Sequence, residues 1–134
     1  LYHYQLGNLL FSYKNFFIDD KLFLPDGIDL EIQNRFREAA MLAPAHLPYR
    51  LRYAQSFFDI ARPNWEAALE EWQQLVNFVE SPEEKQMMQL YMAKTRFEMG
   101  HHTAAQKIIK GIDEPSLEHS KDILLKQINA KHPR

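Results

Sequence analysis

Apolar side chains recur every three or four residues along most of the chain, and this spacing is typical of one face of an α-helix. In no segment do apolar and polar residues alternate between hairpin turns, as they would in a strand. The pattern therefore predicts an all-α protein of about seven helices. Its clearest stripe consists of Trp65, Ala68, Leu69, Trp72, Leu75, Val76 and Val79.

Proline and glycine interrupt this pattern and mark the ends of the expected helices. Residues 18–27 contain Pro25 and Gly27, and we predict that they form a loop that folds back onto the helices through its apolar side chains. The predicted helices cover residues 2–17, 28–42, 47–61, 65–79, 82–99 and 102–112, with a last helix near 115–131.

Residues that favour helix ends stand at several of these boundaries. Ser81 is a good N-cap, Pro82 suits the first helical position, and Glu84 can reach back to complete a capping box. Gly100 is a natural C-terminal stop. The other predicted N-caps are Asp26, Asn64 and either Asp113 or Ser116.

Small residues recur at equivalent places in successive helix pairs. Ala54 and Ala93 stand at one such place and Ala68 and Ala105 at another, about 38 residues apart in each case. Helix pairs repeating at this spacing are typical of a stacked solenoid. The chain resembles the tetratricopeptide repeat family, whose helix–turn–helix units are about 34 residues long. The resemblance is carried by Leu6-Gly7, Tyr53-Ala54, Met92-Ala93, Ala68, Ala105 and Pro44.

The resemblance extends over three helix pairs, near 2–42, 47–79 and 82–112, with a capping helix near 115–131. The chain departs from the family's pattern by an insertion over residues 15–27, by about two extra residues around positions 62–64, and by the lack of a proline after Ile112. The resemblance implies one domain over residues 1–134, folded as a right-handed α-solenoid of antiparallel helix pairs.

In this family the first helix of each pair lines a concave groove that binds a peptide or a partner helix. Arg52 and Lys94, together with tyrosines, suit an extended peptide with a carboxylate or an aromatic anchor. The alternative is that both are ordinary solvated charges, paired with Asp59 and Glu98 within the groove. Carried over by position, the groove residues would be Tyr4, Asn8, Phe11, Leu51, Arg52, Gln55, Asp59, Leu90, Tyr91, Lys94 and Glu98.

No pattern in the sequence predicts catalysis, a metal site or a bound cofactor. The chain has no cysteine and its four glycines are isolated, so we expect neither a thiolate site nor a phosphate-binding loop. His101 and His102 are adjacent, and adjacent residues of a helix point about 100° apart and rarely bind one ion. We therefore predict a non-enzymatic protein–protein interaction module.

The net charge of the chain limits the classes of partner that we expect it to bind. The chain carries 16 basic and 18 acidic residues, a net charge of −2, whereas nucleic-acid binding needs a basic surplus. No apolar run approaches the ~20 residues of a membrane span. We expect a protein or peptide partner. The alternatives are a regulatory or scaffolding segment of a larger enzyme or secretion or assembly complex, and a helical-repeat RNA binder, which the charge disfavours.

The predicted first helix carries apolar residues on several faces, and such a helix is usually covered on more than one side. The cover could come from residues 18–27, from a missing upstream segment, or from a second copy, which would give a weak homodimer. The chain begins at Leu1 instead of Met, so we expect a fragment or a processed product. The sequence does not identify the compartment of the protein, although it favours the cytoplasm. The aromatic residues of this helix are Tyr2, Tyr4, Phe11, Tyr13, Phe16 and Phe17.

Overall fold

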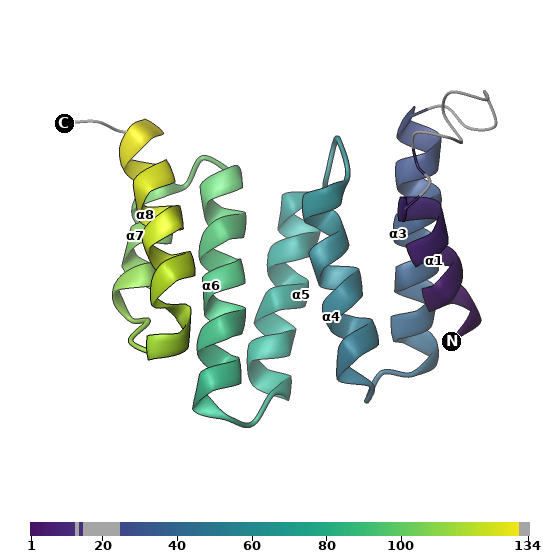
Figure 1. Ribbon diagram of the computed structural model, residues 1–134, viewed down its shortest axis with the longest axis horizontal. Coiled ribbons are helices and arrows are strands. Elements are labelled where there is room, and N and C mark those ends of the chain that lie inside the picture. The colour runs from purple at the N-terminus through teal and green to yellow at the C-terminus, as the bar shows by residue number, and fades with distance from the viewer. Residues whose placement is uncertain (13, 15–24, 132–134) are drawn as a thin grey trace. The chain divides into compact units, whose positions relative to one another are not determined.

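All regular structure in the described part of the chain is helical. The computed structural model describes residues 1–12, 14 and 25–131, which form seven α-helices and two short 3-10 helices. Its contacts divide the chain into two compact units, Leu1–Asn64 (unit 1) and Trp65–Arg134 (unit 2). Within each unit, consecutive described helices pack against each other (Figure 1). This confirms the all-α class, whereas the single solenoid domain stays a prediction.

Unit 1 consists of α1 (Tyr2–Ser12), α3 (Pro25–Leu42), α4 (Leu47–Ser56) and the 3-10 turn η1 (Phe57–Asp59). Helix α3 packs against both α1 and α4. A Cβ atom on Gly7 would lie 2.9 Å from the ring of Phe36, so only glycine lets α1 approach α3 this closely. The buried residues of the core are Leu10, Ile28, Ile32 and Phe36, with Tyr4, Leu6 and Tyr53 packed at their edge.

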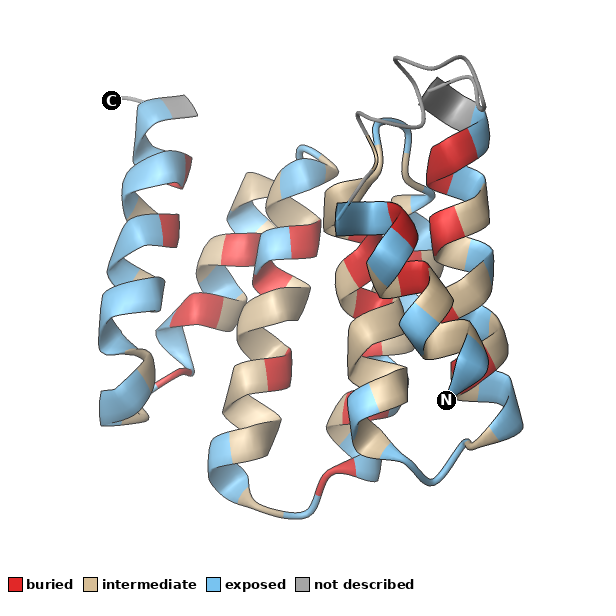
Figure 2. Cartoon of the chain, turned by 45° about the vertical axis from the view of Figure 1, so that its right-hand side comes forward, coloured by how far each residue is buried: buried red, intermediate tan, exposed pale blue. Residues whose placement is uncertain are grey.

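Unit 2 consists of α5 (Trp65–Phe78), α6 (Pro82–Glu98), α7 (His102–Lys110), the 3-10 turn η2 (Pro115–Leu117) and α8 (Glu118–Lys131). Helix α6 packs against α5 and α7, and α8 lies against both α7 and α6. Helix α8 buries Leu124 and Ile128 on one side and leaves most of its other described side chains exposed (Figure 2). A helix with one apolar side of this kind suits a position at the end of a stack.

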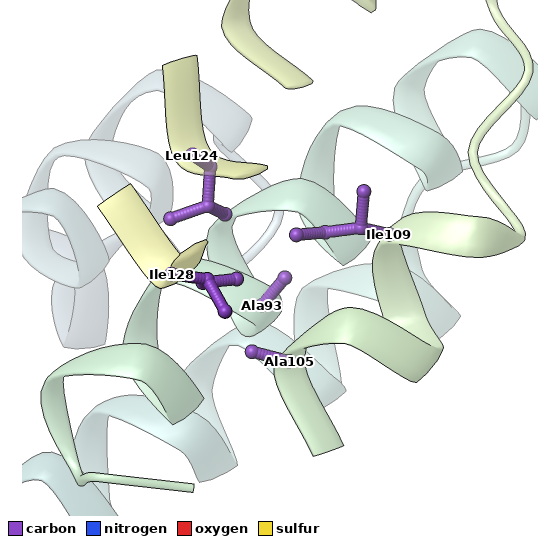
Figure 3. Close-up of a cluster of buried hydrophobic side chains, with 5 residues drawn as sticks. All are labelled: Ala93, Ala105, Ile109, Leu124 and Ile128. Atoms are coloured by element: carbon purple, nitrogen blue, oxygen red, sulfur yellow. The ribbon is translucent and has the colours of Figure 1, made fainter. Parts of the chain in front are cut away.

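The four alanines on which the repeat pattern depends are fully buried. Ala54, Ala68, Ala93 and Ala105 each have an exposed fraction of 0%. Ala93 of α6 and Ala105 of α7 belong to the same buried cluster, so the small residues lie where these two helices pack together (Figure 3). The spacing therefore identified buried positions correctly.

Both ends of α6 have the predicted capping residues. The Ser81 hydroxyl accepts a hydrogen bond from the Glu84 backbone N–H at 3.0 Å and donates one to the Glu84 carboxylate at 2.9 Å. At the other end Gly100 has a φ of +82°, which favours glycine. The His101 N–H donates to the Arg96 carbonyl at 2.9 Å and the Gly100 N–H to the Phe97 carbonyl at 3.0 Å, the pattern of a Schellman motif.

The beginning of α3 differs from the prediction. The helix begins at Pro25, three residues earlier than expected, because the fixed φ of proline and its missing N–H suit the first helical position. Asp26 is therefore inside the helix and is not its N-cap, and the predicted loop is wrong at residues 25–27. The rest of that loop, and all of the predicted first helix after Ser12 except Lys14, lie outside the described residues.

Two other boundaries also differ. Helix α4 ends at Ser56 and continues as η1, after which the Ala61 N–H donates to the buried carboxylate of Asp29 at 2.8 Å instead of extending the helix. The predicted last helix begins as the 3-10 turn η2, and the residue before this turn is Glu114. Asp113 accepts a hydrogen bond from Gln86 and Ser116 lies within the turn, so neither is its N-cap.

Among the described helices, none is both long and apolar enough to cross a membrane.

Candidate binding site

A groove with a volume of about 350 Å³ lies between α6 and α8 in unit 2. The two helices run in the same direction (Figure 1), and both contribute side chains to the lining of the groove. Each helix contributes four residues with the same spacing of i, i+3, i+4 and i+7, which places them on one face. The lining residues are Met87, Leu90, Tyr91 and Lys94 from α6, Ser120, Ile123, Leu124 and Gln127 from α8, and Leu117 from η2.

Beneath the groove, α7 holds α6 and α8 together through a buried apolar cluster. Leu124 belongs both to this cluster and to the groove lining, and Leu90 packs against the cluster while also lining the groove. The groove therefore has an apolar floor that is continuous with the core of unit 2. The buried members of the cluster are Ala93, Ala105, Ile109, Leu124 and Ile128 (Figure 3).

The sides of the groove combine apolar and polar groups. Ile123 leaves 46% of its surface exposed, although it lies next to the apolar floor. Tyr91 stacks face to face on Trp72 of α5, with ring centroids 4.3 Å apart and an interplanar angle of 4°, and this contact fixes its ring. Lys94 is exposed and is the one charged side chain among the described lining residues.

Hydrogen bonds from Gln86 tie the chain between α7 and α8 to α6. The Gln86 side-chain oxygen Oε1 accepts from the backbone N–H groups of Asp113 and Glu114 at 2.9 and 2.8 Å. The side-chain Nε2 donates to the Asp113 carboxylate at 2.6 Å. On the other side of η2, the Lys121 ammonium donates to the Ile112 carbonyl at 2.8 Å. These contacts hold one end of the groove, because Met87 directly follows Gln86 and Leu117 lies between Glu114 and Lys121.

In unit 1 the predicted site residue Arg52 is held by its own unit. It forms an ion pair with Asp59 at 3.0 Å and donates to the Asn8 side-chain oxygen at 3.4 Å. Its guanidinium also lies over the rings of Phe36 and Phe11, at 4.3 and 5.2 Å from their centroids. Only 16% of the Arg52 side chain is exposed. The sequence left open whether Arg52 contacts a ligand or pairs with Asp59, and the structure contains the pairing with Asp59.

The remaining predicted site residues lie partly in unit 1 and partly in unit 2. Tyr4 packs against the core of unit 1 and contacts the rings of Phe36 and Tyr49, with centroids 6.0 and 5.0 Å apart. Leu51 and Gln55 are half-buried in α4, and Glu98 is exposed at the end of α6. The structure thus brings Leu90, Tyr91 and Lys94 together in one groove, whereas in unit 1 Asn8, Phe11 and Asp59 contact Arg52.

A smaller cavity of about 210 Å³ in unit 1 is lined by Asp29, Leu30, Ile60 and Arg62. Asp29 is buried, pairs with Lys14 and accepts the hydrogen bond from the Ala61 N–H. Its carboxylate therefore serves to join the start of α3 to the chain after η1. Elsewhere in the described residues, no three His, Asp or Glu side chains lie close enough to hold a metal ion.

The contribution of α8 to the groove was missed by sequence reasoning, which assigned this helix a capping role alone. The signal that could have revealed it is Ile123, an apolar residue beside the buried Leu124 whose spacing to Ser120 and Gln127 repeats that of Leu90 to Met87 and Lys94. No protein-family model matches the chain, and no curated protein or solved structure matches it. The resemblance to tetratricopeptide repeats stays a prediction from the residues.

Proposed function

We propose that this protein is a non-enzymatic protein–protein interaction module and that the groove between α6 and α8 binds a peptide or helix of its partner. The observation that carries the proposal is the pair of matching stripes on α6 and α8, which form a largely apolar groove with a few polar groups at its sides. Its volume of about 350 Å³ lies within the usual range of binding sites, and its composition is typical of them.

Exposed apolar surface next to a concave floor supports the same proposal. Ile123 leaves 46% of its surface exposed in its own unit, and a ligand in the groove would cover part of that surface. Burying its exposed surface contributes favourably to binding, as does covering the half-buried Leu90. The groove is therefore a better candidate than the Arg52 cluster, whose charged and polar groups already contact one another.

We further propose that the helices form a tetratricopeptide-like right-handed solenoid. Three features support this proposal: the consecutive packing within each unit, the buried small residues at Gly7, Ala93 and Ala105, and the position of α8 against both helices of the preceding pair. In such an array the groove between α6 and α8 is the surface that the first helices of successive pairs would line. The pair expected at 47–79 spans the boundary between units and stays a prediction.

The proposal predicts that Ile123→Glu abolishes ligand binding without unfolding the protein, because a carboxylate would have to be desolvated beside the apolar floor. The probe is a phage-displayed library of random peptides of about 16 residues, roughly four helical turns, selected on the full chain. Asn129→Glu is the matched control, since it places the same charge on an exposed position of the same helix.

Peptides that bind the parent chain and the Asn129→Glu variant, but not Ile123→Glu, would support the groove as the binding site. Both variants should retain the parent's circular dichroism and melting temperature. A selection in which Ile123→Glu retains the same peptides with the same affinity would contradict the proposal.

A further inference from the structure

We infer that this protein forms a weak two-fold homodimer in which α1 packs antiparallel against α1 of a second copy. The contact surface is the outer face of α1 in unit 1, formed by Tyr2, Gln5, Leu9 and Ser12. This face shares no residue with the groove between α6 and α8. Pairing through α1 therefore uses a different part of the chain from ligand binding in the groove. A second copy is one of the three covers that the sequence allows for this helix.

The outer face of α1 is exposed and lies opposite the side that packs on unit 1. Tyr2 leaves 68% and Leu9 49% of its surface exposed, and the exposed Gln5 stands between them. The spacing of three and four residues places these side chains in one stripe along the helix. The buried residues of α1 are Gly7 and Leu10, which lie on the other side of the helix, where it packs against α3.

The outer face of α1 also has no charged side chain. Residues 1–12 contain no Asp, Glu, Lys or Arg. The half-buried ring of His3 belongs to the packed side, where its Nδ1 lies 3.1 Å from a guanidinium nitrogen of Arg35 in α3. A helix at the surface of a globular protein usually carries charged and polar residues on its outer face. An uncharged outer face with large apolar side chains favours contact with another protein surface.

The order of the side chains along this stripe fits a second copy of the same helix. A two-fold interface brings the same surface of both copies together, so the stripe must complement itself. With the axis near Gln5, antiparallel helices place Tyr2 of one copy beside Leu9 of the other and bring the two Gln5 side chains together. An amide both donates and accepts hydrogen bonds, so the two Gln5 side chains can pair with each other. No contact in this arrangement opposes like charges.

The length of the stripe limits the strength of the dimer. From Tyr2 to Ser12 it extends for about 15 Å, or roughly three helical turns. Stable protein–protein interfaces usually bury about 1,200 Å² or more, and a stripe of this length supplies only part of that area. We therefore expect a dimer that dissociates on dilution.

The test is sedimentation velocity of the full chain over a dilution series, with charge changes at Gln5. The parent chain should sediment as a monomer when dilute and shift toward a dimer as its concentration rises. Gln5→Glu and Gln5→Lys each bring like charges together at the axis, and each should weaken self-association by about tenfold or more. An equimolar mixture of the two variants should associate again, because the charges that meet at the axis are then opposite.

The matched controls are Gln73→Glu and Gln73→Lys, which make the same changes at an exposed position of α5 in unit 2. Both controls should leave self-association unchanged. All four variants should retain the circular dichroism and the melting temperature of the parent, because substitutions at exposed positions have little effect on stability.

A parent chain that sediments as a monomer at every concentration would overturn the dimer, and peptide binding in the groove of such a monomer would leave the proposed function intact. Self-association that neither Gln5 variant weakens, or that their mixture fails to restore, would also overturn it. Self-association that is lost in Ile123→Glu and retained in both Gln5 variants would identify the groove as the contact in place of α1.

Discussion

Two cations predicted to serve one groove have different surroundings in the two units. In unit 1, Arg52 is covered by the rings of Phe36 and Phe11 and pairs with Asp59. In unit 2, Lys94 is exposed at the end of an open groove with an apolar floor. Equivalent positions in a repeat pattern therefore do not imply equivalent surroundings, because neighbouring side chains cover Arg52 and leave Lys94 exposed at the groove.

The largest effect that this comparison predicts is on stability in unit 1. Arg52→Ala should lower the free energy of unfolding by about 1–3 kcal/mol, because it removes a charge-assisted contact and leaves the partly buried Asp59 carboxylate without its cation. Chemical denaturation monitored by circular dichroism measures the change. Arg37→Ala, at an exposed position of α3, is the control and should have little effect. An equally small effect of Arg52→Ala would show that the contacts around Arg52 contribute no stability.

An intermediate effect is expected at Gln86, which holds the end of the unit 2 groove. Gln86→Ala should cost about 1 kcal/mol of stability, because three partly exposed hydrogen bonds are lost. Hydrogen exchange gives the sharper measurement, since the Asp113 and Glu114 amides should exchange faster in this variant. Gln89→Ala in the same helix should leave both amides protected. Unchanged exchange of both amides in Gln86→Ala would contradict the proposed tie between α6 and η2.

The smallest effect on stability is expected at Lys94. Lys94→Ala should change the free energy of unfolding by less than about 0.5 kcal/mol, as is usual for exposed residues. The same variant should nevertheless weaken binding of the selected peptides. The opposite result is a clear loss of stability with unchanged binding. It would show that Lys94, like Arg52, stabilises the fold and does not contact the ligand.

Local signals were the most reliable part of the sequence analysis. The capping residues Ser81 and Pro82 and the stop at Gly100 were predicted correctly, because each acts on backbone groups within a few residues. The burial of Ala93 and Ala105 was also predictable, since the repeat spacing places these small residues where helices pack together. The predicted start of α3 is wrong, because a proline can interrupt a helix but equally suits its first turn, as Pro25 does here.

The candidate site was less predictable, because it depends on contacts between residues far apart in the chain. The pairing of Arg52 with Asp59 was foreseen as an alternative, but nothing in the sequence decides that Phe36 and Asn8 also surround Arg52. Leu90 and Lys94 were also predicted to face a groove. Its second wall comes from α8, and this wall depends on the packing of α7 against both α6 and α8, which the sequence does not predict.

The most direct test of the central claim is NMR mapping of a selected peptide on the isotope-labelled full chain. The account predicts that backbone amide shifts change most along the groove, including those of Leu90, Ile123 and Gln127, and change little around Asn8 and Arg52 in unit 1. Shift changes centred on Asn8 and Arg52, with the groove residues unaffected, would contradict the assignment of ligand binding to α6 and α8.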